Sequence, residues 1–412
     1  MTQADCRAQI AAHDRAATES PRRVEFIGLL ALMMAVTAFG IDAMLPALPQ
    51  IGGALVPDDP IRAQLVITSF IFGMGVGTFV TGPLSDFLGR KPVIAVGLVL
   101  YAAGALVSWA APSMTTLLAG RLLMGLGASG PRVTVMAIVR DRFHGAEMAR
   151  IMSLVAVVFM VVPAIAPSTG ALIMHGAGWR GIFLFYALFA TLALSWFYLR
   201  MPETLATAAR RPVRLAMMRD ALREMARLPV IRLSIAIQLM VFGMMFAMLS
   251  SIQGIFETAY DQGTNFPLWF MVIAGASAAS GLLNSHIVMR IGILRIVRST
   301  FAVQVVLTVG MLAVLALPLP RQVEFVFWMI WASSVFMQTS LTVGNVNALA
   351  MEPVGHIAGL ASSLIAAFAT IGSVVLAVPI GLASDGTPLA MALGVLVLAG
   401  LSLVLSWRLR EG

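Results

Sequence analysis

The fold is decided by a short charged stretch, GPLSDFLGRKP at residues 82–92. It separates two apolar runs, residues 63–84 and 92–110, which have about the 20 residues that a helix needs to cross the ~30 Å hydrocarbon core of a bilayer. Helices joined by so short a turn form a hairpin, so the acid and two bases at its tip must face water. The excess of basic residues places this tip on the cytoplasmic side. The stretch therefore predicts a polytopic membrane protein.

The composition agrees with lipid as the solvent. Of 412 residues, 59% are hydrophobic and 11% are charged, and the mean hydropathy is +0.93, whereas soluble domains are about a quarter charged. The net charge of +8 does not indicate nucleic acid, because the basic residues concentrate in connections on one side of the membrane. Cys6 is the only cysteine, which excludes an intrachain disulfide and a thiolate metal site. We expect no metal, no cofactor and no nucleic-acid partner.

Apolar runs of spanning length recur along the chain and predict twelve spans. An even number returns the C-terminus to the side of the N-terminus. Basic connections near Arg90, Arg140 and Arg290 indicate that this side is the cytoplasm. The predicted spans are residues 26–48, 63–84, 92–110, 114–138, 151–174, 180–199, 233–256, 266–288, 299–317, 322–348, 357–383 and 388–408.

A polar segment, residues 200–232, divides the spans into two groups of six and predicts a cytoplasmic linker. We expect the other divisions to be an uncleaved cytoplasmic tail at 1–23, an N-terminal half at 24–199, a C-terminal half at 233–409 and a short tail at 410–412. Within the linker, Leu215, Met218, Leu222 and Met225 recur at helical spacing. This spacing suits an amphipathic helix on the membrane surface, and a merely solvated basic linker fits equally well.

The two groups of six spans contain similar loop sequences at equivalent positions. The sequence MRIGILR at 289–295 lies between spans 8 and 9, where DFLGRK at 86–91 lies between spans 2 and 3. Internal duplication of this kind is a signature of transporter folds. Because Met289 stands where the first copy has Asp86, a latch built on this acid can exist in one half only.

Five short motifs follow one another in order. They are the GPLSDFLGRKP loop, DAMLPALP at 42–49, Arg121 with Gly125, Pro163 with APSTG at 166–170, and NA at 347–348 followed by AGLASS at 358–363. With twelve spans, they resemble the major facilitator superfamily and, within it, the Bcr/CflA branch of drug:proton antiporters. The resemblance implies an all-α integral membrane protein with twelve transmembrane helices in two pseudo-symmetric six-helix halves.

The resemblance also implies roles for two of the motifs. The loop would form a cytoplasmic latch, with its acid acting on a neighbouring helix N-terminus; alternatively, its bases serve only to orient the chain. The latch residues would be Gly82, Asp86, Gly89, Arg90 and Lys91. The span 5 motif would be a conformational element formed by Pro163, Pro167 and Gly170. The chain departs from the family pattern at Phe87, Met44 and Met136, so we expect its substrate pocket to be its own.

Asp42 and Arg121 are the candidates for proton coupling. Asp42 lies inside span 1, where an ionised carboxylate costs several kcal/mol unless it is paired or faces water. Arg121 in span 4 lies at a similar depth, so the two groups can meet, and a pair that forms and breaks can release and reload a proton. Two plainer interpretations stay open: Pro46 and Pro49 end the helix early, so that Asp42 reaches the outer interface, or Arg121 is a structural anchor.

Several residues are candidates for substrate contact. Arg132 follows Arg121 by three helical turns on nearly the same face, which suggests an anionic or carbonyl-bearing substrate unless the side chain reaches the cytoplasmic interface. The other candidates are Met44, Met240, Met244, Gln338 and Asn345. The methionines at 240, 244 and 248 share a helix face, which is conceivable as a Cu(I) path and more typical of pliable packing.

The sequence therefore predicts a proton-coupled secondary transporter that exports small amphipathic drugs or metabolites by alternating access. The alternatives are a transporter of one anionic metabolite or siderophore, a copper transporter, and a non-transporting sensor with the same fold. No enzyme motif occurs, and we expect no catalytic residues. The expected partners are a small molecule, protons and lipid. We expect a monomer in the bacterial inner membrane with both termini in the cytoplasm.

Overall fold

A computed structural model describes residues 23–210 and 215–409, and within these ranges the chain is helical with no β-strand. The N-terminal half contains α2 (Arg23–Asp42), α3 (Leu48–Leu55), α4 (Leu65–Leu88), α5 (Arg90–Trp109), α6 (Met114–Arg142) and α7 (Gly145–Arg200), with 3-10 turns η1 (Leu45–Ala47) and η2 (Pro60–Gln64). After η3 (Thr207–Ala209), the rest contains α8 (Leu215–Arg227), α9 (Pro229–Thr258), α10 (Phe266–Ile291), α11 (Ile293–Ala316), α12 (Arg321–Met351), η4 (Glu352–Ile357), α13 (Ala358–Leu382) and α14 (Pro388–Arg408).

Ten stretches of the described chain are long and apolar enough to cross a membrane, and two of these contain two crossings each. The stretch Arg321–Leu382 combines α12 and α13 across η4. Helix α7 turns at Gly178, where φ is 64°, a backbone conformation that suits glycine. Both ends of α7 meet the start of α2, because Arg23 pairs with Glu147 at 2.9 Å and Glu25 pairs with Arg200 at 2.7 Å. The twelve crossings predicted from the sequence are thus confirmed.

The N-terminal half owes its tight packing to small residues. A Cβ atom at Gly73 would collide with the carbonyl of Leu122 on α6, and one at Gly125 would collide with the carbonyl of Phe70 on α4. Glycines on both helices therefore allow backbone-to-backbone contact. Such contact is a main source of helix association in lipid, where the hydrophobic effect between helices is weak.

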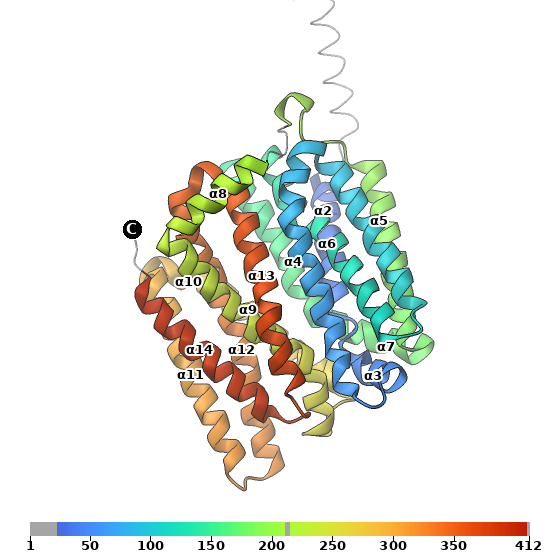
Figure 1. The fold of residues 1–412 in the computed structure, drawn as a ribbon, viewed down its shortest axis with the longest axis vertical. Helices are drawn as coiled ribbons and strands as arrows, with labels where there is room; N and C mark the ends of the chain where they lie inside the picture. Colours follow the sequence, from blue (N-terminus) through green and yellow to red (C-terminus); the bar gives the residue numbers. More distant parts are fainter. Residues whose placement is uncertain (1–22, 211–214, 410–412) are drawn as a thin grey trace, which may run out of the picture.

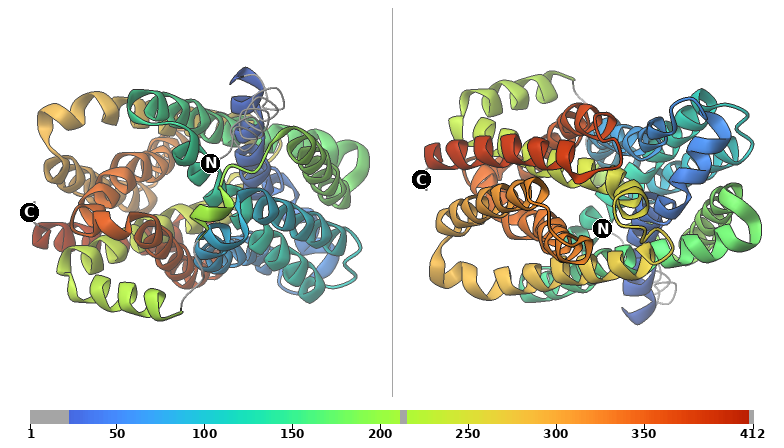
Figure 2. Two further views of the ribbon diagram at one scale, coloured as in Figure 1. Left: turned by 90° about the horizontal axis from the view of Figure 1, so that it is seen from above. Right: turned by 90° about the horizontal axis from the view of Figure 1, so that it is seen from below.

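The two halves lie side by side when viewed from either end (Figure 2) and meet mainly along α4 with α13 and along α7 with α10. The rings of Phe79 on α4 and Phe368 on α13 pack edge to face at 5.4 Å. Helix α8 lies across one end of the C-terminal half (Figure 1), which we call the α8 end; α3 lies at the opposite end, the α3 end. These inter-half contacts enclose the space in which the candidate site lies.

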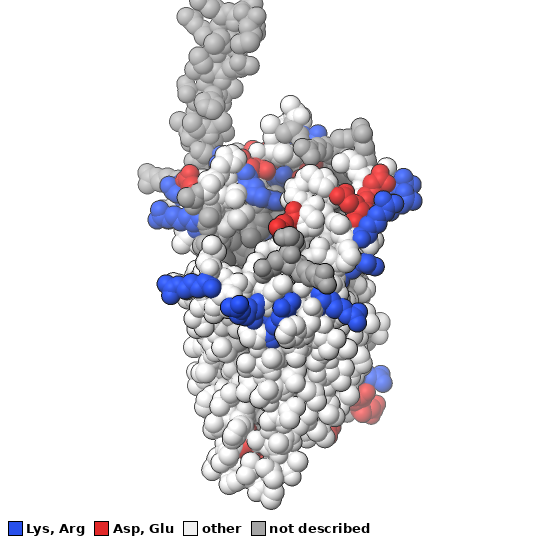
Figure 3. Space-filling view, turned by 90° about the vertical axis from the view of Figure 1, so that its left-hand side faces the viewer, with Lys and Arg blue, Asp and Glu red and all other residues white. Residues whose placement is uncertain are grey.

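Helix α8 is held by the protein itself. Ala221 and Met225 are buried against Ile231, Ala350 and Leu364 of the C-terminal half. Of the apolar residues predicted for this face, Met225 is buried and Leu222 packs against the same cluster, while Arg219, Arg223 and Arg227 remain exposed. Lys and Arg side chains gather toward the α8 end of the molecule, above a broad surface almost free of charge (Figure 3).

Candidate functional site

A cavity of about 300 Å³ lies between the two halves in the interior of the bundle. The N-terminal half supplies its charged residues, Asp42 and Arg132, and the C-terminal half supplies most of its aromatic surface. The lining residues are Ala38, Ile41, Asp42, Met74, Arg132, Pro163, Phe242, Met245, Phe246, Leu249, Phe270, Ala274, Ser277, Ala278, Phe336, Thr339 and Ser340. A small apolar cavity with a few polar groups is typical of a site for a small organic ligand.

Asp42 is the last residue of α2 and is only 5% exposed. The helix ends there because η1 follows, with Pro46 at its start. Within the described residues, no hydrogen bond or ion pair involves its carboxyl group, and the side chain lines the cavity. One interpretation of the sequence was that Pro46 and Pro49 end the helix early and bring Asp42 to the outer interface. The helix does end at Asp42, but the side chain remains buried. A carboxyl group in this position is available to a proton or to a ligand in the cavity.

Arg121 is fully buried and does not line the cavity. Its Nε donates to the carbonyl of Val66 on α4 at 2.9 Å, and its Nη1 donates to the carbonyl of Gly40 on α2 at 2.9 Å. The guanidinium also stacks over the Phe70 ring at 4.5 Å. Among the described residues, it forms no ion pair with Asp42. Arg121 joins three helices and holds the last turn of α2, two residues before Asp42.

Arg132 lies on α6 immediately after Pro131 and is partly buried at the cavity wall. Its Nη1 is 3.2 Å from the sulfur of Met74. In residues 23–210 and 215–409, no carboxylate lies within ion-pair distance of it. The cavity therefore contains one acid and one base, and the structure shows no direct pair between them.

The remaining substrate candidates lie outside the cavity lining. Met44 is fully buried, and the Met240 sulfur accepts from the Ser402 hydroxyl at 3.5 Å. Gln338 donates to the Met244 sulfur at 3.4 Å, and its Oε1 atom is buried without a partner in the described chain. Asn345 donates to Asn284 Oδ1 at 2.9 Å. These contacts join helices of the C-terminal half.

Sequence reasoning missed four phenylalanines that line the cavity. Phe242 and Phe246 on α9 stack at 5.8 Å, and Phe270 on α10 meets Phe336 on α12 edge to face at 5.8 Å. The missed signal was the spacing of residues 242, 245, 246 and 249, which form a face of α9 adjacent to the face that carries Met240 and Met244. Aromatic rings offer large contact area and edge-to-face geometry to planar ligands.

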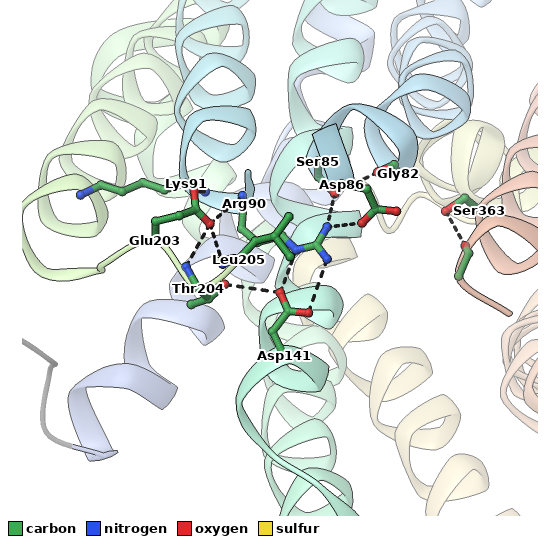
Figure 4. A network of polar contacts seen from close by, with 11 residues as sticks. Gly82, Ser85, Asp86, Arg90, Lys91, Asp141, Glu203, Thr204, Leu205 and Ser363 are labelled. Carbon is green, nitrogen blue, oxygen red and sulfur yellow. Dashed lines mark hydrogen bonds and ion pairs between the residues drawn. The ribbon is translucent and has the colours of Figure 1, made fainter. Parts of the chain in front are cut away.

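At the α8 end, the charged turn forms a connected network (Figure 4). Arg90 pairs with Asp86 through Nη1 and donates from Nε to Asp141 Oδ2 at 2.8 Å, so it joins α4, α5 and α6. Glu203, which follows α7, accepts from the backbone amides of Arg90 at 2.9 Å and Lys91 at 3.1 Å. This carboxylate therefore pairs with backbone N–H groups that have no partner within α5, at a helix end where the dipole favours an anion. Sequence reasoning assigned such a role to Asp86 and missed Glu203.

Two glycines shape the same network. Gly89 links α4 to α5 with φ of 108°, which a residue with a side chain rarely adopts. A Cβ atom at Gly82 would lie 2.7 Å from the hydroxyl oxygen of Ser363 on α13, so glycine permits α4 to approach the other half there (Figure 4). The turn predicted to form a latch is thus a junction of helices that borders the opposite half.

The proline and glycine motif of α7 packs beside the end of α2. A Cβ atom at Gly170 would collide with the carbonyl of Ala43, the residue after Asp42. Pro163 on the same helix lines the cavity. Any change in α7 at this motif would therefore reach the backbone that carries Asp42.

At the α3 end, the halves are joined by Gln64 of η2. Its Oε1 atom accepts from the hydroxyls of Ser251 at 3.0 Å and Ser250 at 3.5 Å, both on α9. Glycine at position 381 of α13 leaves room for this side chain, because a Cβ atom there would collide with Gln64 Oε1. The contact closes one side of an outer cavity of about 280 Å³ that also reaches Gly254.

Comparison with known proteins identifies a matching family and related resistance proteins. A model of the Major Facilitator Superfamily matches residues 30–377. The bicyclomycin resistance protein homolog of Haemophilus influenzae is 30% identical over 347 residues, which cover 82% of this chain and 84% of that protein. The multidrug resistance protein MdtL of Escherichia coli is 33% identical over 172 residues, 41% of this chain and 44% of MdtL.

Solved structures agree on the fold. A D-xylose-proton symporter superimposes with a TM-score of 0.75 at 14% identity, covering 94% of this chain and 98% of that one. The human organic anion transporter MFSD10 gives a TM-score of 0.65 at 18% identity, covering 95% of this chain and 100% of that one. At these sequence identities, the structural similarity shows a shared fold and does not indicate which compound this chain transports.

Proposed function

This chain belongs to the major facilitator superfamily, and from that premise we propose that it exports small amphipathic drugs or metabolites in exchange for protons. The family and its relatives establish a multi-pass membrane transporter of small molecules. The single observation that carries the finer proposal is the cavity between the halves. In it, Asp42 from one half, which has no bonding partner among the described residues, lies opposite aromatic rings from the other half. The resistance names of the relatives are consistent with drug-like cargo.

Asp42 supplies the coupling in this proposal. An ionised carboxylate without a partner in an apolar interior costs several kcal/mol, so we expect the carboxyl group to hold a proton whenever no ligand is bound beside it. A ligand that donates a hydrogen bond or carries positive charge stabilises the ionised form instead. Proton and ligand therefore compete for one group, and competition for one site is sufficient for exchange transport when the cavity opens alternately to the two sides.

Alternating access requires contacts that break at each end in turn. The Gln64 contact joins the halves at the α3 end, and the Arg90 network borders the opposite half at the α8 end. Rocking of one half against the other about a central site is the common mechanism of such folds. Arg121 contributes by keeping the last turn of α2 in place as the halves move, which is a positioning role.

The orientation is part of the same proposal. The gathering of Lys and Arg toward the α8 end supports a cytoplasmic location for that end, with both termini there, in a bacterial inner membrane (Figure 3). We propose a monomer surrounded by lipid, with residues 200–232 as the linker between the halves.

The decisive experiment uses the purified chain in proteoliposomes with an imposed pH gradient and a panel of drug-like compounds. Compound-dependent proton flux in the wild type, lost in Asp42→Asn, supports the proposal. Compound movement that is indifferent to the pH gradient would refute proton coupling. Absence of movement for every compound, with the protein correctly inserted, would favour a non-transporting sensor.

A dedicated transporter of an anionic metabolite or siderophore is the second candidate, and Arg132 favours it. Its guanidinium reaches the cavity wall and lacks a carboxylate partner in the described chain. A ligand carboxylate or carbonyl would offset the cost of that buried charge. Competition binding with matched acidic and neutral compounds separates the two candidates. The geometry does not favour copper, because Met240 and Met244 lie outside the cavity lining.

A further inference from the structure

One surface at the α8 end carries basic side chains that form no ion pair with an acid of the described residues. Arg290 lies in the last turn of α10, Arg295 in the first turn of α11, and Arg408 at the end of α14, which packs against α11. All three side chains are exposed, and within residues 23–210 and 215–409 none forms an ion pair. We call these residues, with the neighbouring Trp407, the arginine surface.

The duplicated turn of the other half shows what is missing. There, Arg90 is paired with Asp86 and Asp141. In the second copy, Met289 replaces the first of these acids and is 89% exposed. By the same register, Ile293 stands where the first copy has Arg90, and Arg290 and Arg295 stand where it has Phe87 and Pro92. The first turn therefore carries a base that is paired with acids inside the protein, whereas the bases of the second turn form no ion pair within the described chain. The uncompensated charge of the second copy is free to bind an external anion.

The end of α14 is ordered by Arg298. Its Nε donates to the carbonyl of Ser406 at 3.3 Å, its Nη2 donates to the carbonyl of Leu409 at 3.1 Å, and its guanidinium lies 4.6 Å from the centre of the Trp407 ring. These contacts hold the segment that contains Arg408 against the beginning of α11. The Trp407 side chain is 65% exposed, and tryptophan is enriched where a membrane protein meets the headgroup region.

The acids of α8 do not compensate this charge. Asp220 lies within ion-pair distance of Arg219 and Arg223, and Glu224 lies 3.2 Å from His356. On the face that carries α14 and α11, a row of basic side chains crosses the molecule directly above a surface almost free of charge (Figure 3). The exposed residues of α11 and α14 on this surface are largely apolar and include Val303, Val306 and Val404. Basic groups at this height meet phospholipid headgroups, since the apolar surface below them faces the acyl chains.

We propose that the arginine surface binds the headgroup phosphates of anionic phospholipids. A guanidinium offers paired N–H groups that match phosphate oxygens, and arginine is weakly hydrated compared with lysine. A zwitterionic lipid presents the same phosphate together with a cation that the surface repels. The surface therefore distinguishes lipids by net charge, and the C-terminal half gains a lipid contact that the internally neutralised N-terminal turn lacks.

The test is native mass spectrometry of the purified full chain in mixed micelles with phosphatidylglycerol or phosphatidylcholine of the same acyl chains. We expect the wild type to retain phosphatidylglycerol preferentially. Each arginine near an anionic surface contributes about fivefold to binding, so the triple change Arg290→Gln, Arg295→Gln and Arg408→Gln should reduce this preference by at least tenfold. The corresponding lysine variant should keep most of it, because the charge remains.

A matched control changes two arginines at the α3 end, Arg62→Gln and Arg321→Gln, and should leave the preference unchanged. An equal loss in this control would overturn the proposal, as would a triple variant that still selects phosphatidylglycerol. Millimolar inorganic phosphate should not displace the lipid; if it does, the surface is a general anion site and the lipid assignment is wrong. The readout is binding, so it is independent of whether the chain exchanges drugs for protons.

Discussion

Gln64 is expected to determine how readily the α3 end opens. Its Oε1 atom accepts one good hydrogen bond from Ser251 at 3.0 Å and one at the limit of bonding from Ser250 at 3.5 Å. A neutral hydrogen bond contributes about 0.5–1.5 kcal/mol net, so the two together are worth roughly 1–2 kcal/mol. Since these bonds join the two halves, Gln64→Ala should shift the equilibrium toward the form open at the α3 end by about 5- to 30-fold.

The assay is labelling of a single cysteine from the α3 side with a membrane-impermeant maleimide. Gly254→Cys, in a Cys6→Ser background, is a suitable reporter because it lines the outer cavity and a Cβ atom there has open space. Gln64→Ala should raise the labelling rate within the predicted range. The matched control is Ser69→Ala, because the Ser69 hydroxyl bonds only to the Val66 carbonyl of its own helix in the described structure.

A double-mutant cycle checks the assignment. Ser251→Ala should raise the labelling rate by itself, and adding it to Gln64→Ala should have little further effect, since the main shared hydrogen bond is already lost. Labelling of the Gln64 variant at the wild-type rate would refute the reasoning, and so would full additivity of the two substitutions. Gly381→Ala gives an independent check, because its Cβ atom would displace the Gln64 side chain and should also increase labelling.

Three further predictions concern charged residues. Asp42→Asn should abolish uphill, proton-driven transport while leaving substrate binding measurable by calorimetry, because the amide fills the same space and cannot exchange a proton; full uphill transport by this variant would contradict the coupling role. Asp86→Asn removes the ion pair between Asp86, which is 52% exposed, and Arg90. Because exposed ion pairs contribute little, the equilibrium should shift toward the form open at the α8 end by no more than a few-fold. Unchanged cysteine labelling at that end would contradict the latch role of Asp86. Arg132→Ala should weaken binding of anionic or carbonyl-rich compounds by at least ~1 kcal/mol and affect lipophilic cations little, with Arg132→Lys as the control, and equal losses for both charge classes would show that the residue only supports the helix.

Local patterns in the sequence were sufficient to predict the fold. Spanning length, the charge of the loops and the polar break at 200–232 are properties of contiguous residues, and a bilayer imposes them on each segment separately. For that reason the twelve crossings and the family followed from the sequence, although α7 contains two of them around Gly178. The position of Asp42 inside a span was also visible, because a lone acid in an apolar run is conspicuous.

The partners of these residues depended on the tertiary structure. Arg121 and Asp42 lie at similar depth, yet Arg121 bonds to the carbonyls of Val66 and Gly40, a preference that depends on the rotation of each helix about its axis. Glu203 reaches the α5 N-terminus from a segment more than a hundred residues away, and sequence periodicity carries no information about such a contact.

By itself, the sequence therefore determined which segments cross the membrane, which end is basic, and that one turn carries an acid while its duplicate does not. The tertiary structure decided which side chains share the cavity, because small differences in helix rotation and approach choose the face that points inward. Phe242 and Phe246 line the cavity, whereas Met240 and Met244 on the adjacent face of α9 pack against other helices. Lipid tails and the surfaces of neighbouring helices are similarly apolar, so hydrophobicity alone cannot decide which face of a membrane helix points inward. Close packing and hydrogen bonds between helices must decide it.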